Sequence, residues 1–164
     1  MIAVDAGGAG VLEAADLVHA HFATRVGVFS DPPDATDREF LHRGLPYYDA
    51  AALEQRQLRA LGVSDVEVIP RPVEGTHDEG SILPRWCAER GYRTILFVST
   101  TDHSRRTRRV LRRELRGSAV AVRVLYSKYS LFNPNAWWRS RTGIRIEIVE
   151  AEKLLLDILR HPLS

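Results

Sequence analysis

Short apolar runs alternate along the chain with longer stretches of helical periodicity. Each apolar run is bounded by glycine, proline or polar residues, and this pattern predicts buried strands. The predicted strands lie at residues 1–4, 26–29, 66–69, 94–98 and 120–125. Between and after them, apolar residues recur at helical spacing at residues 11–22, 34–43, 50–61, 77–90, 104–115 and 146–159.

This alternation predicts βαβ units, whose right-handed crossovers build a parallel sheet. The run at 94–98, Thr-Ile-Leu-Phe-Val, is almost continuously apolar, which is typical of a strand covered on both faces. The sequence therefore predicts one α/β domain over residues 1–164. It should hold a parallel sheet of about five strands with helices on both faces.

The helical segments also predict which side chains face the core. In the first helix the inward positions are Val11, Leu12, Ala15, Val18 and Phe22, and in the fifth they are Thr107, Val110, Leu111 and Leu115. Cys87 is the single cysteine and lies on an apolar helix face with Trp86. Both are predicted core residues, because a free cysteine is usually buried and inert.

Composition narrows the class of protein. A chain of 164 residues that is 45% hydrophobic and 27% charged is typical of a globular domain. The net charge of +2 is too small to favour a nucleic-acid partner. No apolar stretch approaches the ~20 residues of a membrane span, and no secretion signal is present, so we expect a cytoplasmic protein. Because the first strand begins almost at Met1, a start further upstream stays open.

The carboxyl ends of parallel strands are where α/β folds bind ligands. The richest such loop is Ser99-Thr100-Thr101-Asp102-His103-Ser104-Arg105-Arg106, which opens a predicted helix. Free N–H groups at a helix start favour an anion, Arg105 or Arg106 could clamp it, and His103 could act as acid or base. The alternative is that Thr101 or Asp102 only caps the helix.

A second cluster, residues 74–79, follows the third strand. Glu74 could act as a general base, whereas Thr76 and Glu79 also have the spacing of a capping box. His77 and Asp78 are adjacent to Glu79, and adjacent helical residues point in different directions. They could therefore hold one metal ion only with ligands from other loops, so a metal stays open and we name no ligands for it.

A third loop, Asp5 to Gly8, follows the first strand. Its glycines lack the spacing of a dinucleotide-binding or phosphate-binding loop. We predict a tight turn in which Asp5, Gly7 and Gly8 approach the ligand.

Seven arginines between Arg105 and Arg116 could indicate a nucleic-acid surface. They fall on the outward side of an amphipathic helix, and Glu114 interrupts them. We therefore predict a solvated face, and a nucleic-acid-binding surface is the alternative. Trp137 and Trp138 either cover the site, or pack on the last helix and at a dimer contact. The sequence does not predict an oligomeric state.

From Glu54 onward the chain resembles the ElyC/SanA/YdcF-type domain, a bacterial family of mostly unknown function. The matching segments are a helix with Glu54 that ends in Leu-Gly-Val, a strand with Glu-x-Thr at 68–78, Ser-x-x-x-His-x-Arg-Arg at 99–106, the Trp137-Trp138 loop and a last helix with Glu150 and Lys153. Glu13-Ala14-Ala15 resembles a further segment of the family.

The resemblance implies a three-layer Rossmann-like fold with a polar pocket at the strand ends. Family pocket residues map to Glu54, Glu74, Thr76, Ser99, His103, Arg106, Glu150 and Lys153. The family is associated with envelope physiology, and one branch with S-adenosylmethionine. Because no apolar stretch of this sequence is long enough to span a membrane, we do not expect the membrane anchor that is common in envelope members. Together these observations predict a small-molecule site, with catalytic His103 and Glu74 and a ligand held by the other residues, including Trp138. A non-catalytic S-adenosylmethionine or nucleotide module is the alternative.

Overall fold

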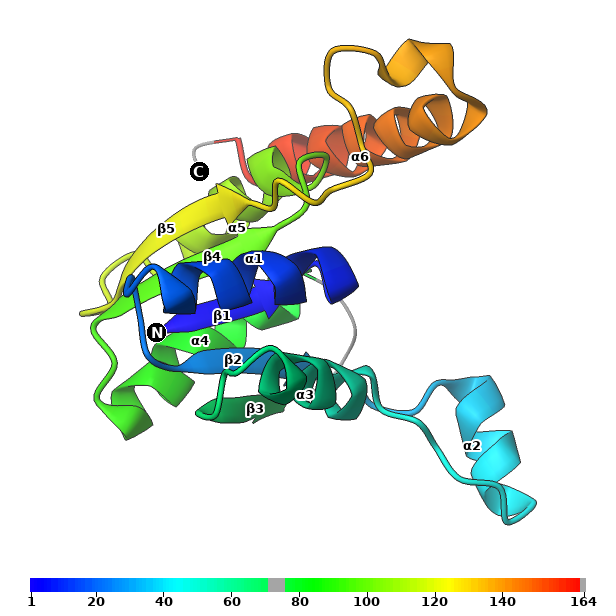
Figure 1. Cartoon of the computed structure of the whole chain (residues 1–164). Helices are drawn as coiled ribbons and strands as arrows, with labels where there is room; N and C mark the ends of the chain where they lie inside the picture. The colour runs from blue at the N-terminus through cyan, green and yellow to red at the C-terminus, as the bar shows by residue number, and fades with distance from the viewer. Residues whose placement is uncertain (71–75, 163–164) are drawn as a thin grey trace.

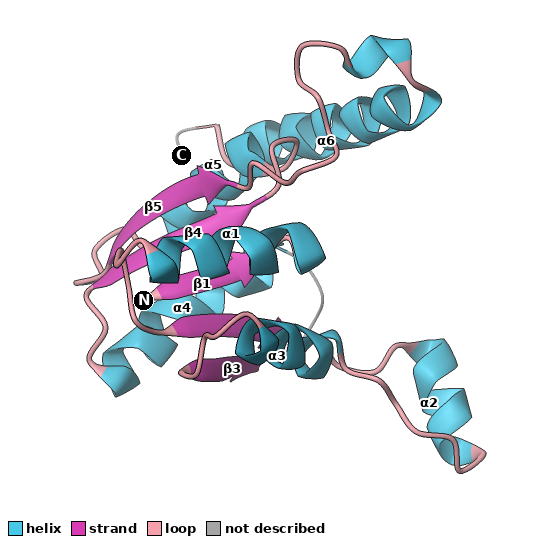
Figure 2. Cartoon of the chain, in the orientation of Figure 1, coloured by secondary structure: helices cyan, strands magenta, loops and turns pink. Residues whose placement is uncertain are grey.

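The computed structural model describes residues 1–70 and 76–162, with the backbone alone for 76–79. It shows a five-stranded parallel sheet with helices on both faces (Figures 1 and 2), which confirms the predicted fold class. The strands are β1 (Ile2–Asp5), β2 (Val26–Ser30), β3 (Val66–Pro70), β4 (Thr94–Ser99) and β5 (Ala121–Tyr126). The helices are α1 (Gly7–His19), α2 (Ala35–His42), α3 (Ala50–Ala60), α4 (Thr76–Arg90), α5 (Ser104–Glu114), the short 3₁₀ helix η1 (Trp137–Arg139) and α6 (Arg141–Arg160).

The strand order is β3-β2-β1-β4-β5, so the chain reverses its direction across the sheet between β1 and β4. In an open α/β sheet this switch point opens a crevice at the carboxyl ends of the strands. Asp5 is paired in register with Ser99 at that point, and Ser99 with Tyr126 of β5. The loops after β1, β4 and β5 therefore meet at one edge of the sheet.

Two apolar clusters fill the space on either side of the sheet. On one face Val4 and Val28 pack against α1 and α3, and on the other Phe97 packs against α4 and α5. Trp86 and Cys87 belong to the second cluster, and burial raises the pKa of the Cys87 thiol to about 11. The predicted core positions of the fifth helix are confirmed, since Thr107, Val110, Leu111 and Leu115 are all buried.

The first helix begins earlier than predicted. Gly7, with φ of +50°, and Gly8 form its first turn instead of a separate tight turn. A Cβ at Gly10 would lie 2.6 Å from Cγ1 of Val4, so only glycine lets this turn approach β1 so closely. The inward placement of Leu12 and Phe22 is wrong. Leu12 is 40% exposed, and Phe22, at 68% exposure, lies beyond the end of the helix.

Two helices lie away from the sheet. Figure 1 shows α2 projecting away from the sheet and its covering helices, and it contains no buried residue. The last helix begins at Arg141, earlier than predicted, where Ser140 Oγ accepts a hydrogen bond from Gly143 N. It packs on α5 and η1 instead of covering the sheet. Within residues 1–70 and 76–162, no helix combines the length and apolar character needed to cross a lipid bilayer.

Candidate functional site

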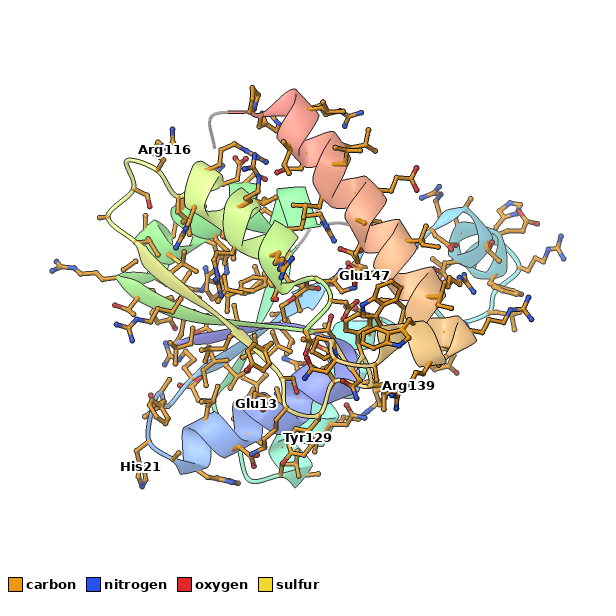
Figure 3. All side chains as sticks on the ribbon, turned by 90° about the horizontal axis from the view of Figure 1, so that it is seen from above. Glu13, His21, Arg116, Tyr129, Arg139 and Glu147 are labelled. Atoms are coloured by element: carbon orange, nitrogen blue, oxygen red, sulfur yellow. The ribbon has the colours of Figure 1, made fainter. Side chains whose placement is uncertain are left out.

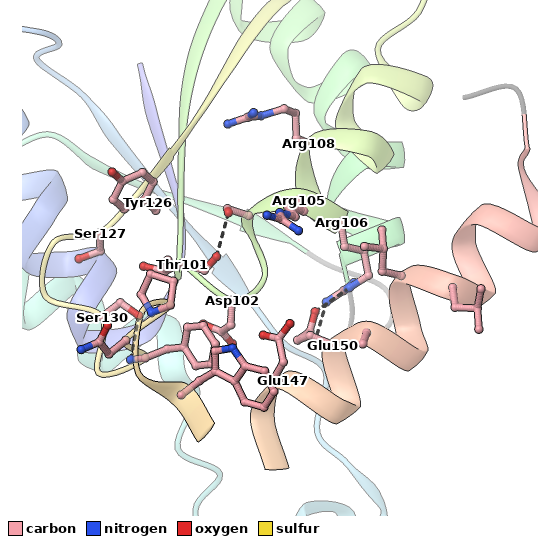
Figure 4. A pocket seen from close by; sticks show the side chains of 18 of the residues that line it. Thr101, Asp102, Arg105, Arg106, Arg108, Tyr126, Ser127, Ser130, Glu147 and Glu150 are labelled. Carbon is pink, nitrogen blue, oxygen red and sulfur yellow. Dashed lines mark hydrogen bonds and ion pairs between the residues drawn. The ribbon is translucent and has the colours of Figure 1, made fainter. Parts of the chain in front are cut away.

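A groove of about 1100 Å³ lies at the carboxyl ends of β4 and β5, between α5 and α6 (Figure 4). Its volume is at the upper end of ligand pockets, which are typically ~300–1,000 Å³. Its lining combines polar and charged side chains with aromatic and aliphatic ones. The polar lining includes Thr101, Asp102, Ser104, Arg105, Arg106, Arg108, Ser127, Lys128, Ser130, Glu147 and Glu150, and the apolar lining includes Tyr126, Phe132, Pro134, Trp137, Ala151, Leu154, Leu155 and Ile158.

The start of α5 forms one end of the groove. Residues 101–103 turn the chain out of β4, and Ser104 Oγ donates a hydrogen bond to the Thr101 carbonyl at 2.9 Å. His103, the residue before the helix, does not cap it through its side chain. The first-turn N–H groups of a helix and its dipole favour negative charge. This end of the groove is therefore suited to an anion.

The loop after β5 forms another wall and is fixed in place by the first helix. Ser127, which is buried, donates through Oγ to the Ala9 carbonyl at 2.6 Å and through its backbone N to the Ser99 carbonyl at 2.9 Å. The backbone N of Lys128 donates to Glu13 Oε2 at 3.1 Å, and Figure 3 shows Glu13 beside this loop. The wall is thus held by α1 and β4 together.

A cluster of ion pairs centred on Glu150 lies beneath the groove. The Glu150 side chain is only 7% exposed. It accepts from Arg106 Nε at 3.0 Å, from Lys153 Nζ at 3.1 Å and from His103 Nδ1 at 3.2 Å. The other ring nitrogen of His103, Nε2, lies 2.9 Å from Asp102 Oδ2. The cluster therefore connects the start of α5 to the middle of α6.

These contacts change the charge states within the cluster. The carboxylates of Asp102 and Glu150 raise the pKa of His103 to about 9. Burial alone would raise the pKa of Glu150, but His103 and Arg106 lower it to about 2. Burial would also raise the pKa of Asp102, but the contact with His103 keeps it below its usual value. The raised pKa favours the protonated form of His103 at neutral pH, and Arg106 Nη2 lies 3.1 Å from the Nδ1 that faces Glu150.

We expect the stability contributed by this cluster to depend on pH in both directions. The contribution of His103 is complete below its ordinary pKa of 6.5 and is lost as pH rises through about 9. That of Glu150 is complete above 4.5 and is lost as pH falls through about 2. Urea unfolding should therefore be hardest between pH 4.5 and 6.5. In His103→Asn the free energy of unfolding should fall less between pH 6.5 and 9 than in the original protein. An unchanged fall over this range would contradict the assignment.

A second set of ion pairs holds the rest of α6. Asp157 binds Arg109 Nε at 2.8 Å and Arg113 Nη1 at 2.9 Å. Together with Arg106, these arginines form a row on α5 that faces α6. The prediction of a solvated face is therefore wrong for Arg106, Arg109 and Arg113.

The other arginines of this segment are exposed, and none of the four has an ion-pair partner among the described residues: Arg105, Arg108, Arg112 and Arg116. Arg116 lies just beyond the end of α5 and is labelled in Figure 3. Arg105 and Arg108 line the groove, whereas Arg112 and Arg116 lie beyond it. The nucleic-acid alternative stays a prediction that depends on these four side chains.

The structure brings together five of the predicted site residues. Arg105, Arg106 and Glu150 line the groove, and His103 and Lys153 contact Glu150. Asp5, Gly7 and Gly8 lie at the end of β1, next to β4, but outside the groove lining. The Ser99 side chain is fully buried, and its Oγ has no hydrogen-bond partner among the described residues. Thr100 Oγ1 is also buried.

Other predicted residues lie elsewhere. Glu54 belongs to α3, which packs on β2 and β3, so it does not line the groove. Trp138 is 53% exposed and outside the lining, whereas its neighbour Trp137 is part of it. Glu74 and the side chain of Thr76 lie outside the described residues.

Several residues of the groove have no separate role in the sequence-based prediction. Asp102 was considered only as a helix cap, although an acid next to histidine in the chain could have indicated the ion pair. Arg108 was grouped with the outward-facing arginines, and Tyr126 and Lys128 had no motif. Glu147 lies seven residues before Leu154, which is two helical turns, and this repeat could have placed both on the groove side of α6.

Fold and site define the class of this protein as a three-layer, Rossmann-like α/β domain with a basic and partly apolar groove at the carboxyl ends of its strands. Comparison of the chain with protein-family models, with curated proteins and with solved structures found no match. Among the described residues there is no group of three or more His, Cys, Asp or Glu side chains placed to hold a metal ion.

Proposed function

We propose that the protein binds a small anionic ligand in the groove between α5 and α6. The observation that carries this proposal is the pair Arg105 and Arg108, which line the groove without an ion-pair partner among the described residues. In the part of the chain that the structure describes, three acids line the same groove. Asp102 and Glu150 are paired with cations of the cluster. Of these three, only the carboxylate of Glu147 therefore stands against the charge of Arg105 and Arg108. A bidentate contact from arginine suits a phosphate or a carboxylate.

His103 supports binding more than proton transfer. With both ring nitrogens facing carboxylates and a pKa of about 9, it contributes positive charge near the start of α5 at neutral pH. In this proposal Arg105 and Arg108 contact the anion, and the cluster around Glu150 keeps α5 and α6 in position around it. The ligand then binds to a preformed site.

The first test is a thermal-shift panel of ATP, S-adenosylmethionine and a sugar phosphate. A ligand at one hundred times its dissociation constant stabilises the fold by about 2.7 kcal/mol. For a chain of this length the melting temperature should rise by roughly 5–10 °C. A hit without turnover favours a binding module, and a hit that is consumed favours an enzyme.

We expect the double variant Arg105→Ala/Arg108→Ala to lose this shift. Each charge-assisted hydrogen bond is worth about 1.5–3 kcal/mol, so affinity should fall by about two orders of magnitude or more. Both side chains are exposed, so the unliganded melting temperature should stay within about 1–2 °C of the original. The matched control is Arg112→Ala/Arg116→Ala, which removes two exposed arginines of the same segment that lie outside the groove. If both doubles bind equally well, the groove is not the anion site.

Membership of the ElyC/SanA/YdcF-type family stays part of this proposal. It is supported by the order of the short motifs, and His103, Arg106, Glu150 and Lys153 of those motifs form one cluster. A cytoplasmic location stays a prediction. Binding of S-adenosylmethionine or a nucleotide is also a prediction, and the thermal-shift panel tests it.

A further inference from the structure

The bank of the groove formed by α6 carries an aliphatic stretch that is open to solvent, next to the carboxylates of Glu147 and Glu150. Ala151, Leu154, Leu155 and Ile158 line it, and Leu155 and Ile158 are 57% and 39% exposed. Large apolar side chains grouped at a groove usually mark a binding surface. Trp137 extends the same apolar surface from η1.

This exposure follows from the way α6 is attached. Glu150 and Asp157 point to α5 and bind its arginines, and the buried residues of α6 are only Gly143 and Glu150. No residue of α6 belongs to either core cluster. Leu154, Leu155 and Ile158 are therefore left beside the groove instead of packing on the sheet.

The opposite bank is cationic and polar. Arg105 and Arg108 of α5 lie on it (Figure 4), together with the hydroxyls of Thr101 and Ser104. An inorganic anion would use this bank alone and leave Leu155 and Ile158 in water. A purely apolar molecule would leave both arginines without a counter-charge.

We propose that the ligand of the groove is amphiphilic, an anionic headgroup joined to an alkyl chain. The headgroup lies against Arg105 and Arg108, and the chain lies along Leu154, Leu155 and Ile158. This inference rests on the proposed function and specifies its ligand class. It is carried by the two unlike banks of a single groove.

The test is calorimetric titration of the intact protein with inorganic phosphate and with butyl, hexyl, octyl and decyl phosphate, below their aggregation concentrations. Burying one methylene contributes about 0.8 kcal/mol, so affinity should rise by about fourfold per methylene wherever the chain contacts α6. If octyl phosphate binds no more tightly than inorganic phosphate, the inference fails and the anion site stands. If no anion binds, the proposed function fails as well.

Substitutions on α6 locate the chain. Leu155→Ala/Ile158→Ala should reduce the gain per methylene and leave the affinity for inorganic phosphate unchanged. The matched control is Ile148→Ala/Leu159→Ala, two side chains of the same helix that are 60% and 69% exposed and do not line the groove. If affinity depends on alkyl-chain length equally in both double variants, the alkyl chain does not lie along Leu155 and Ile158.

A headgroup with an alkyl chain can be a free molecule or part of a bilayer. Co-sedimentation with phosphatidylcholine vesicles containing phosphatidylglycerol, reversed by octyl phosphate, would support a lipid in the membrane. Octyl phosphate binding without co-sedimentation would support a free amphiphile. Co-sedimentation that octyl phosphate does not reverse would place membrane contact outside the groove and overturn the inference.

Discussion

Glu150→Ala should destabilise the protein by about 3 kcal/mol, because removing one partner of a buried ion pair leaves the other charges uncompensated. Here the carboxylate is 7% exposed, and three cationic groups lose their shared partner. We use the lower end of the usual range because Lys153 and His103 are partly exposed. Urea unfolding measures the loss, and the melting temperature should fall by roughly 6–12 °C.

The site of the damage is also predicted. Because α6 contributes nothing to the two core clusters, its backbone amides should lose hydrogen-exchange protection before those of β4. Glu150→Gln keeps the size of the side chain without its charge, and we expect it to be nearly as destabilising. Glu152→Ala, on an exposed part of the same helix, is the matched control and should change stability by less than about 0.5 kcal/mol. Equal effects at both positions would show that the ion cluster does not hold α6.

Gly143→Ala should cost about 2–3 kcal/mol and distort the aromatic end of the groove. A Cβ at this position would lie 2.3 Å from the backbone oxygen of Trp137 and 2.9 Å from Ser140 Oγ. Backbone cannot move aside as a flexible side chain can, so either η1 or the first turn of α6 must shift. Chemical denaturation measures the cost, and the tryptophan fluorescence, to which Trp137 contributes together with Trp86 and Trp138, should change with the distortion.

Gly8→Ala is the control for that substitution. Gly8 also lies in the first turn of a helix, but a Cβ there meets no atom within 4 Å. Since alanine is favoured over glycine in helices by about 1 kcal/mol, this variant should be neutral or slightly more stable. If Gly143→Ala behaves in the same way, the close packing of η1 on α6 is not required.

The sheet and its covering helices could be predicted because their apolar residues follow two simple periods. The apolar run at 94–98 predicts a buried strand, and the positions of Val110 and Leu111 predict the buried face of α5. Both predictions are confirmed. Phe22 was misplaced because periodicity does not show where a helix ends. The start of α1 was missed because glycines usually interrupt helices, whereas Gly10 is needed there for contact with β1.

The site was only partly predictable, because it depends on where α6 lies. Loop chemistry after β4 indicated Arg105 and Arg106, and the motifs of the resemblance indicated Glu150. That α6 would pack on α5 instead of the sheet could not be read from its amphipathic pattern, since the same pattern fits either surface. Arg108 and Leu155 enter the groove only through that placement.

The attachment of α6 by charge has a geometric consequence. Glu150 and Asp157 lie two turns apart and match Arg106 and Arg113, which lie two turns apart on α5. Apolar contact is non-directional and would tolerate a helix rolled about its axis or slid by one turn. Two guanidinium–carboxylate ion pairs with this spacing fit only one rotation of α6 about its axis. That rotation determines which side chains of α6 face the groove.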